Sequence, residues 1–147
     1  MPLQSTIERA RRDQREGKSP STQAGEFVRE EIRHIRKGDH GARSPEQAIA
    51  IGLSMARRAG VKLPPPSAGK ASAETRRKAR LDLQAGRRQA KPSLTRSRAR
   101  IKVLRRESTS AASPSALSRH AKKAARHRGP TDLSRAAKKA ARTRRLH

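Results

Sequence analysis

Residues 21–66 read STQAGEFVREEIRHIRKGDHGARSPEQAIAIGLSMARRAGVKLPPP, and this stretch decides the fold. Apolar side chains in its first half recur with the spacing of one helical face, at Ala24, Phe27, Val28, Ile32 and Ile35. Gly38 follows them, and glycine is a common residue just after a helix end. The pattern predicts a helix over residues 22–37, capped by Ser21 or Thr22.

A second helix is predicted over residues 45–59. Ser44 caps it, Pro45 takes the first helical position, and Gln47 completes a capping box. Its apolar stripe consists of Ile49, Leu53 and Ala56, with Ala48, Ile51 and Met55 beside them. The connection of residues 38–43 is short, so the two helices are expected to pack as an antiparallel hairpin.

The beginning of the chain predicts a weaker helix over residues 6–16, where Ser5 and Glu8 resemble a capping box and Gly17 a stop. Three prolines at 64–66 cannot continue a helix and mark a boundary. We therefore expect an all-α protein in which residues 1–66 form a small helical domain.

Charge separates residues 67–147 from this domain. They hold 25 Lys and Arg against 4 Asp and Glu, whereas residues 1–66 hold 13 against 8. Leu, Ile, Val and Phe number only 20 among all 147 residues, and cysteine is absent. Such a composition excludes a large core and a disulfide scaffold, because little apolar burial is available to offset the entropy of ordering. The second part is expected to be a basic, largely disordered or conditionally helical tail.

The tail contains an internal repeat. LSRHAKKAARHR at residues 117–128 recurs as LSRAAKKAARTR at residues 133–144, with ten of twelve positions identical. The residues Gly129, Pro130 and Thr131 separate the copies. Like charges three and four residues apart oppose helix formation in free solution. Alanine favours a helix, and a phosphate polymer would remove the repulsion, so we expect the tail to gain helix on nucleic acid.

The net charge of +26 predicts a polyanionic partner, because clustered Lys and Arg are the electrostatic signature of nucleic-acid-binding proteins. The expected phosphate-binding residues are Arg119, Lys122, Lys123, Arg126, Arg128, Arg135, Lys138, Lys139, Arg142, Arg144 and Arg145. Phe27 is the only aromatic residue, and RNA modules commonly stack bases on aromatic rings, so double-stranded DNA is favoured over RNA. The predicted function is sequence-nonspecific, nucleoid-associated DNA binding.

Two alternatives stay open: an RNA- or ribosome-associated structural protein, and a protein-interaction module with an accessory basic tail. A homodimer through the hairpin of residues 21–63 is also possible, because domains this small often need oligomerisation.

No enzyme motif is present, and neither a cofactor nor a metal site is expected, because no histidines are spaced four apart and there is no cysteine. Glu26, Glu30 and Glu31 are interpreted as charges near a helix start. Asp39 and His40 are interpreted as residues of a turn, and surface histidine is the default expectation. No apolar run is long enough for a secretory signal or a membrane span, so a cytoplasmic location at the nucleoid is expected.

Three segments carry a family resemblance: GEFVREEI at 25–32, HGARS at 40–44 and QAIAIGLS at 47–54. With them, about residues 5–66 resemble a family of small basic bacterial proteins of unknown function. The resemblance implies a bacterial cytoplasmic protein and supplies no activity and no site residues. The tail is similar in composition to the tails of linker histones and bacterial histone-like proteins.

Overall fold

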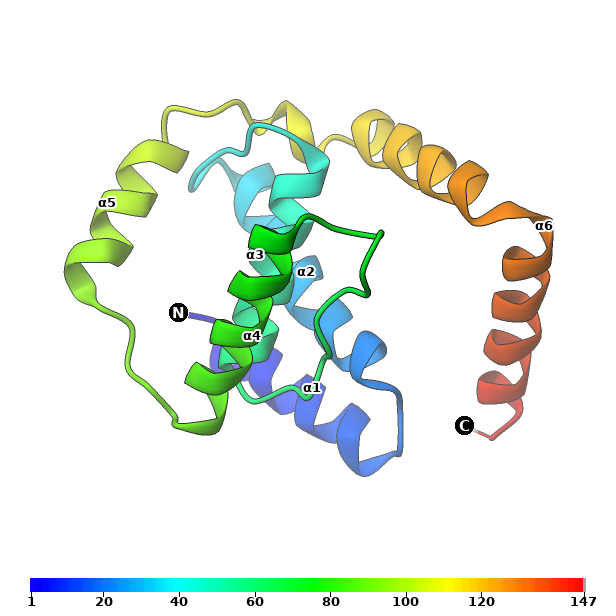
Figure 1. The fold of residues 1–147 in the computed structure, drawn as a ribbon. Coiled ribbons are helices and arrows are strands. Elements are labelled where there is room, and N and C mark those ends of the chain that lie inside the picture. Colours follow the sequence, from blue (N-terminus) through cyan, green and yellow to red (C-terminus); the bar gives the residue numbers. More distant parts are fainter. Residues whose placement is uncertain (147) are drawn as a thin grey trace.

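The computed structural model describes residues 1–146, which form six α-helices and one 3₁₀ helix and contain no β-strand. The elements are α1 (Gln4–Arg15), α2 (Pro20–Lys37), α3 (Pro45–Arg58), α4 (Ala73–Arg87), α5 (Leu94–Leu104), η1 (Thr109–Ala112) and α6 (Pro114–Leu146). The predicted all-α class is confirmed. Figure 1 shows α1–α4 forming the body, with α5 and the second half of α6 standing away from it. None of the helices described is long and apolar enough to cross a membrane.

Helix α2 begins earlier than predicted. Its N-cap is Ser19, whose Oγ accepts a hydrogen bond from the Thr22 backbone N–H, and Pro20 takes the first turn. Proline is suited to this position because its fixed φ is helical and it has no N–H left unbonded. The predicted stop is confirmed, since Gly38 caps the C-terminus with a φ of 84°.

Helix α1 is capped by another helix rather than by its own sequence. The predicted Ser5–Glu8 capping box is wrong, because α1 begins at Gln4 and its N-cap, Leu3, makes no side-chain cap. Instead both carboxylate oxygens of Glu30, in α2, accept the Leu3 N–H at 3.0 and 3.2 Å. A buried carboxylate therefore satisfies a donor at the start of α1 and fixes α1 on α2.

The main core lies where α1, α2, α3 and the chain after α3 meet. Its buried members are Ala10, Ala24, Phe27, Ala56 and Val61. Val61 and Leu63 fold back over the end of α3, and α2 and α3 make the most extensive contact between elements. A Cβ at Gly52 would lie 2.6 Å from the Val28 Cα, so glycine is needed where the two helices touch.

Helix α4 packs on α3. Asp82 accepts hydrogen bonds from Ser54 Oγ at 2.7 Å and Arg58 Nε at 2.8 Å. Gly86 lies near the end of this helix. It allows close approach of the two helices, because a Cβ there would be 2.0 Å from the Arg57 carbonyl oxygen.

A second core cluster joins the body to the chain before α6. It consists of Ile35, Ala42, Ala48, Ala111 and Ala112. The Ser/Ala/Thr/Pro stretch 107–115 thus contributes buried alanines through η1. Backbone hydrogen bonds from Gly41 N to Leu104 O and from Ala42 N to Ser108 O hold it in place.

The expectation of a largely disordered tail is wrong for the described residues: α4, α5 and α6 account for most of residues 73–146. Ser72 and Ser93 cap α4 and α5, and alanine supplies high helix propensity in place of a core. The predicted break between the repeat copies is confirmed, because Gly129 has φ 73° and ψ 167° and bends α6 sharply. One repeat copy lies on each side of the bend (Figure 1).

Candidate nucleic-acid interface

Helix α6 carries the predicted phosphate-binding residues, and the structure leaves all eleven of their side chains exposed. Only two of them have a partner in residues 1–146: Arg135 lies 3.6 Å from the Asp132 carboxylate, and Arg144 Nε donates to the Ala140 carbonyl at 3.4 Å. The other nine are free to meet an external anion. An exposed helix with mostly unpaired cations is the arrangement that a phosphate-binding surface requires.

Each repeat copy places four cations on one face of the helix. They stand at i, i+3, i+4 and i+7, a spacing that aligns side chains along one side. The residues are Arg119, Lys122, Lys123 and Arg126 in the first copy, and Arg135, Lys138, Lys139 and Arg142 in the second. We call these two groups the first and second cation rows.

The first half of α6 is docked on the body. Ala116 is buried, and His120 Nδ1 lies 3.0 Å from Glu46 Oε1 at the start of α3. A backbone hydrogen bond at Glu46 itself, with the hydrogen bonds from His120 and Ser44, lowers the pKa of Glu46 to about 2. This contact positions the first cation row relative to the body.

The Glu46 contact predicts a pH effect. A carboxyl group whose pKa is lower in the folded state adds stability above its unfolded value of 4.5, and that stability is lost as the pH falls toward 2. We expect NMR titration to place the Glu46 carboxyl pKa near 2. In His120→Ala the pKa should rise but stay below 4.5, because the backbone hydrogen bond remains. A pKa unchanged by His120→Ala would contradict the contact.

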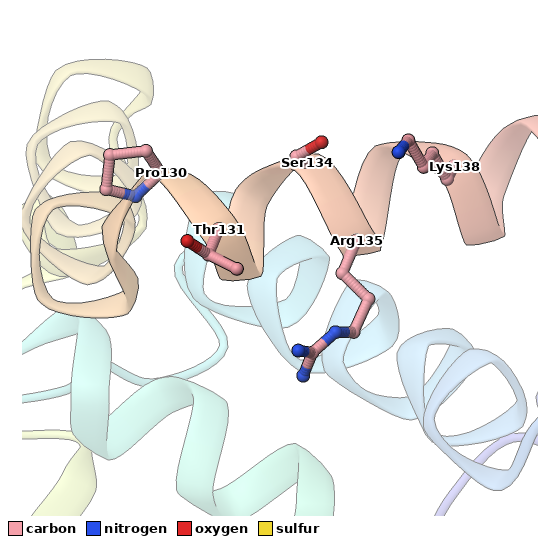
Figure 2. A pocket seen from close by; sticks show the side chains of 5 residues that line it. All are labelled: Pro130, Thr131, Ser134, Arg135 and Lys138. Carbon is pink, nitrogen blue, oxygen red and sulfur yellow. The ribbon is translucent and has the colours of Figure 1, made fainter.

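The second half of α6 stands apart from the body in Figure 1. An open depression on its surface is lined by Pro130, Thr131, Ser134, Arg135 and Lys138. Figure 2 shows the Arg135 side chain reaching out from the helix while Ser134 and Lys138 lie along another side. Exposed hydroxyl groups and cations of this kind can bind phosphate oxygens.

The predicted phosphate-binding residues all lie in or just after the repeat, and the cations of α5 were not among them. This helix packs against no other helix in residues 1–146, and Arg96, Arg98, Arg100 and Lys102 are exposed on it. A cavity of about 570 Å³ lies between α1, α3 and the chain of residues 89–100. Its cations are Arg11, Arg58, Lys91, Arg96 and Arg100. The clustering of basic residues over 87–106 was the available signal for this surface.

The acidic side chains of α2, which were interpreted as charges near a helix start, are buried. Glu26, Glu30 and Glu31 are 8%, 1% and 2% exposed. Burial acts to raise the pKa of Glu26, but hydrogen bonds and charge from Arg9 and Arg29 lower it overall. These three carboxylates therefore face inward, and the exposed cations of α6 are left without them as partners.

The histidine of the turn is buried as well. His40 is 7% exposed, so the surface default is wrong for it, and its Nε2 lies 3.5 Å from Glu31 Oε1. His34, Glu31 and His40 converge at the end of α2. The sequence did not reveal this grouping, because the two histidines are not spaced four residues apart. His40 comes close to Glu31 and His34 only through the turn at Gly38.

No curated protein and no solved structure matches the chain. Residues 4–67 match the model of a family of unknown function (DUF6496). The match covers α1, α2 and α3 and leaves α4, α5 and α6 outside it.

Proposed function

We propose that this protein is a non-enzymatic, mainly sequence-nonspecific DNA-binding protein of the nucleoid. The exposed and mostly unpaired cations of α6 support this function most directly. Lys and Arg that neutralise backbone phosphates release condensed counterions, and this release supplies most of the free energy of nonspecific binding. The body serves as the module that presents α6.

The shape of α6 fits a duplex backbone. Each half spans about fifteen residues, or roughly 22 Å at 1.5 Å per residue, which is shorter than one turn of B-DNA at about 34–36 Å. The bend at Gly129 lets the two halves take different directions, so each cation row can follow a separate stretch of backbone. The first half is docked on the body and would hold the body next to the DNA. The second half would contact a further stretch of the duplex.

Burial of Phe27 favours duplex DNA over single-stranded RNA. Phe27 is 1% exposed in the main core, so residues 1–146 present no Phe, Tyr or Trp ring on which an unpaired base could stack. Backbone recognition of a duplex needs no aromatic residue. Structured RNA also offers a phosphate backbone and is the second candidate.

The function is tested by competition at fixed salt. The full chain is bound to a labelled DNA duplex and challenged with unlabelled duplexes of two unrelated sequences and with a structured RNA of equal phosphate content. We expect the two DNA competitors to act equally, because phosphates carry no sequence information. We expect the RNA to compete less well than either. Stronger competition by RNA would favour the RNA-associated alternative, and no binding to any of them would refute the proposal.

A further inference from the structure

Three side chains with metal-ligand atoms converge where α2 ends. Glu31 and His34 lie three residues apart on α2 and therefore on the same face. Gly38 then turns the chain, so that His40 returns to this face. One ligand atom from each of the three residues lies within 4.8 Å of the other two. Two imidazoles and one carboxylate form a donor set that divalent transition metals bind.

The orientation of His40 presents a free nitrogen to the cluster. Its Nδ1 lies 3.0 Å from the Gly41 carbonyl oxygen. Because a carbonyl oxygen can only accept, Nδ1 carries the proton and Nε2 has the lone pair when the imidazole is neutral. That Nε2 lies 3.5 Å from Glu31 Oε1. A histidine whose other ring nitrogen donates to a backbone carbonyl is held as metal-ligating histidines usually are.

Glu31 has a buried oxygen without a hydrogen bond. Its side chain is 2% exposed, and within residues 1–146 no donor hydrogen-bonds to Oε1. Burial raises the pKa of Glu31, although the charge of His40 acts in the opposite direction. An unsatisfied buried carboxylate oxygen is costly, and a positive ion between it and His40 would remove the cost. Glu30, its neighbour, is already satisfied by the Leu3 N–H.

We propose that Glu31, His34 and His40 bind one divalent transition metal ion, and that zinc fits the site best. Zinc binds histidine nitrogen and carboxylate oxygen at about 2.0–2.2 Å with tetrahedral geometry, which separates neighbouring ligand atoms by about 3.4 Å. The distance between His40 Nε2 and Glu31 Oε1 is 3.5 Å. Three protein ligands leave the fourth position for water, and the His34 side chain is 27% exposed to solvent.

The metal would fasten the loop after α2 to the helix. Gly41 and Ala42 in this loop donate backbone hydrogen bonds to the carbonyls of Leu104 and Ser108. The loop thereby holds the segment that leads through η1 into α6. Zinc binding would consequently stabilise the native state, because the three ligands come together only in the folded chain. This inference does not depend on nucleic-acid binding.

The test uses the full chain without a histidine tag, freed of metal by a chelator. Zinc is titrated by calorimetry, and cobalt, which replaces zinc and absorbs visible light strongly when tetrahedral, is added in a parallel experiment. We expect one zinc per chain, the tetrahedral cobalt spectrum, and a higher thermal midpoint with zinc present. Failure of the full chain to bind either ion would overturn the proposal.

Variants assign the ligands. His34→Gln removes a partly exposed ligand outside both core clusters, and Glu31→Gln keeps the size of a buried one. Each should weaken zinc binding by at least about tenfold. Replacing a residue that only hydrogen-bonds to a metal ligand already costs about that much affinity, so loss of a ligand itself should cost no less. His127→Gln changes an exposed histidine of α6 and should bind zinc as the unmodified chain does. Circular dichroism checks that all three fold. Zinc binding unchanged in both His34→Gln and Glu31→Gln would show that the cluster is only a buried ion pair.

Discussion

Replacing the second cation row by glutamine should make DNA binding markedly less sensitive to salt. The variant carries Arg135→Gln, Lys138→Gln, Lys139→Gln and Arg142→Gln, all at exposed positions. Each neutralised phosphate contributes about −0.9 to the slope of log K against log salt, so the slope should become shallower by up to about 3.6. Over a fourfold rise in salt this corresponds to roughly a 100-fold smaller loss of affinity. Fluorescence anisotropy with one duplex at several salt concentrations measures both quantities.

A matched control removes the same charge from elsewhere. Arg12→Gln, Arg15→Gln, Lys37→Gln and Lys62→Gln also change four exposed cations, but none of them lies on α6. If the interface is on α6, this control should keep nearly the slope of the unmodified chain. Equal slopes in the two variants would show that net charge, rather than the placement of the second cation row, determines binding.

Neutralising the first cation row as well extends the test. The additional changes are Arg119→Gln, Lys122→Gln, Lys123→Gln and Arg126→Gln, also on exposed positions. If both halves of α6 contact phosphates, the slope should become shallower by up to about 7 in total. A second step much smaller than the first would confine the contact to the half of α6 beyond Gly129.

Gly52→Ala should destabilise the protein by about 1–3 kcal/mol, the usual cost of overpacking a tight contact. A Cβ at this position would lie 2.6 Å from the Val28 Cα and 2.9 Å from the Val28 nitrogen. Backbone atoms cannot rotate away, so α2 and α3 must separate. The separation outweighs the advantage of alanine over glycine in a helix, about 1 kcal/mol. Urea unfolding followed by circular dichroism measures the change.

Gly25→Ala is the matched control and should have the opposite sign. Gly25 also lies inside a helix, α2, but a Cβ there would meet nothing within 4 Å. The substitution should therefore stabilise the protein by roughly 0.5–1 kcal/mol, because alanine loses less backbone entropy on folding. If both substitutions changed the free energy of unfolding in the same direction, the α2–α3 contact at Gly52 would not be as described.

The local signals in residues 21–66 predicted the helices well. The periodic apolar face of α2 places Ala24, Phe27 and Ile35 in the core, and Ser44 caps α3 as predicted. These features depend on neighbours a few residues away, which is why they can be read directly. The start of α1 could not be predicted in this way, because its donor is satisfied by Glu30, 27 residues along the chain from Leu3.

The exposed cations of the candidate interface were also predictable, since charge needs no partner in order to stay at the surface. The Glu31, His34 and His40 cluster was not, because it depends on the turn at Gly38 and on burial. Burial changes a carboxylate from a solvated charge into an unsatisfied acceptor, and nothing in the local pattern reveals which carboxylates it will cover.

The amino-acid sequence determined by itself that the chain would be helical and rich in exposed positive charge, with a break between two basic repeats. Helix periodicity, caps and charge are local or additive properties. Only the tertiary structure decided that the 107–115 stretch docks through Ala111 and Ala112, and that three carboxylates of α2 turn inward. Those outcomes depend on how closely helices approach at positions such as Gly52 and Gly86, and on which polar groups the approach removes from water.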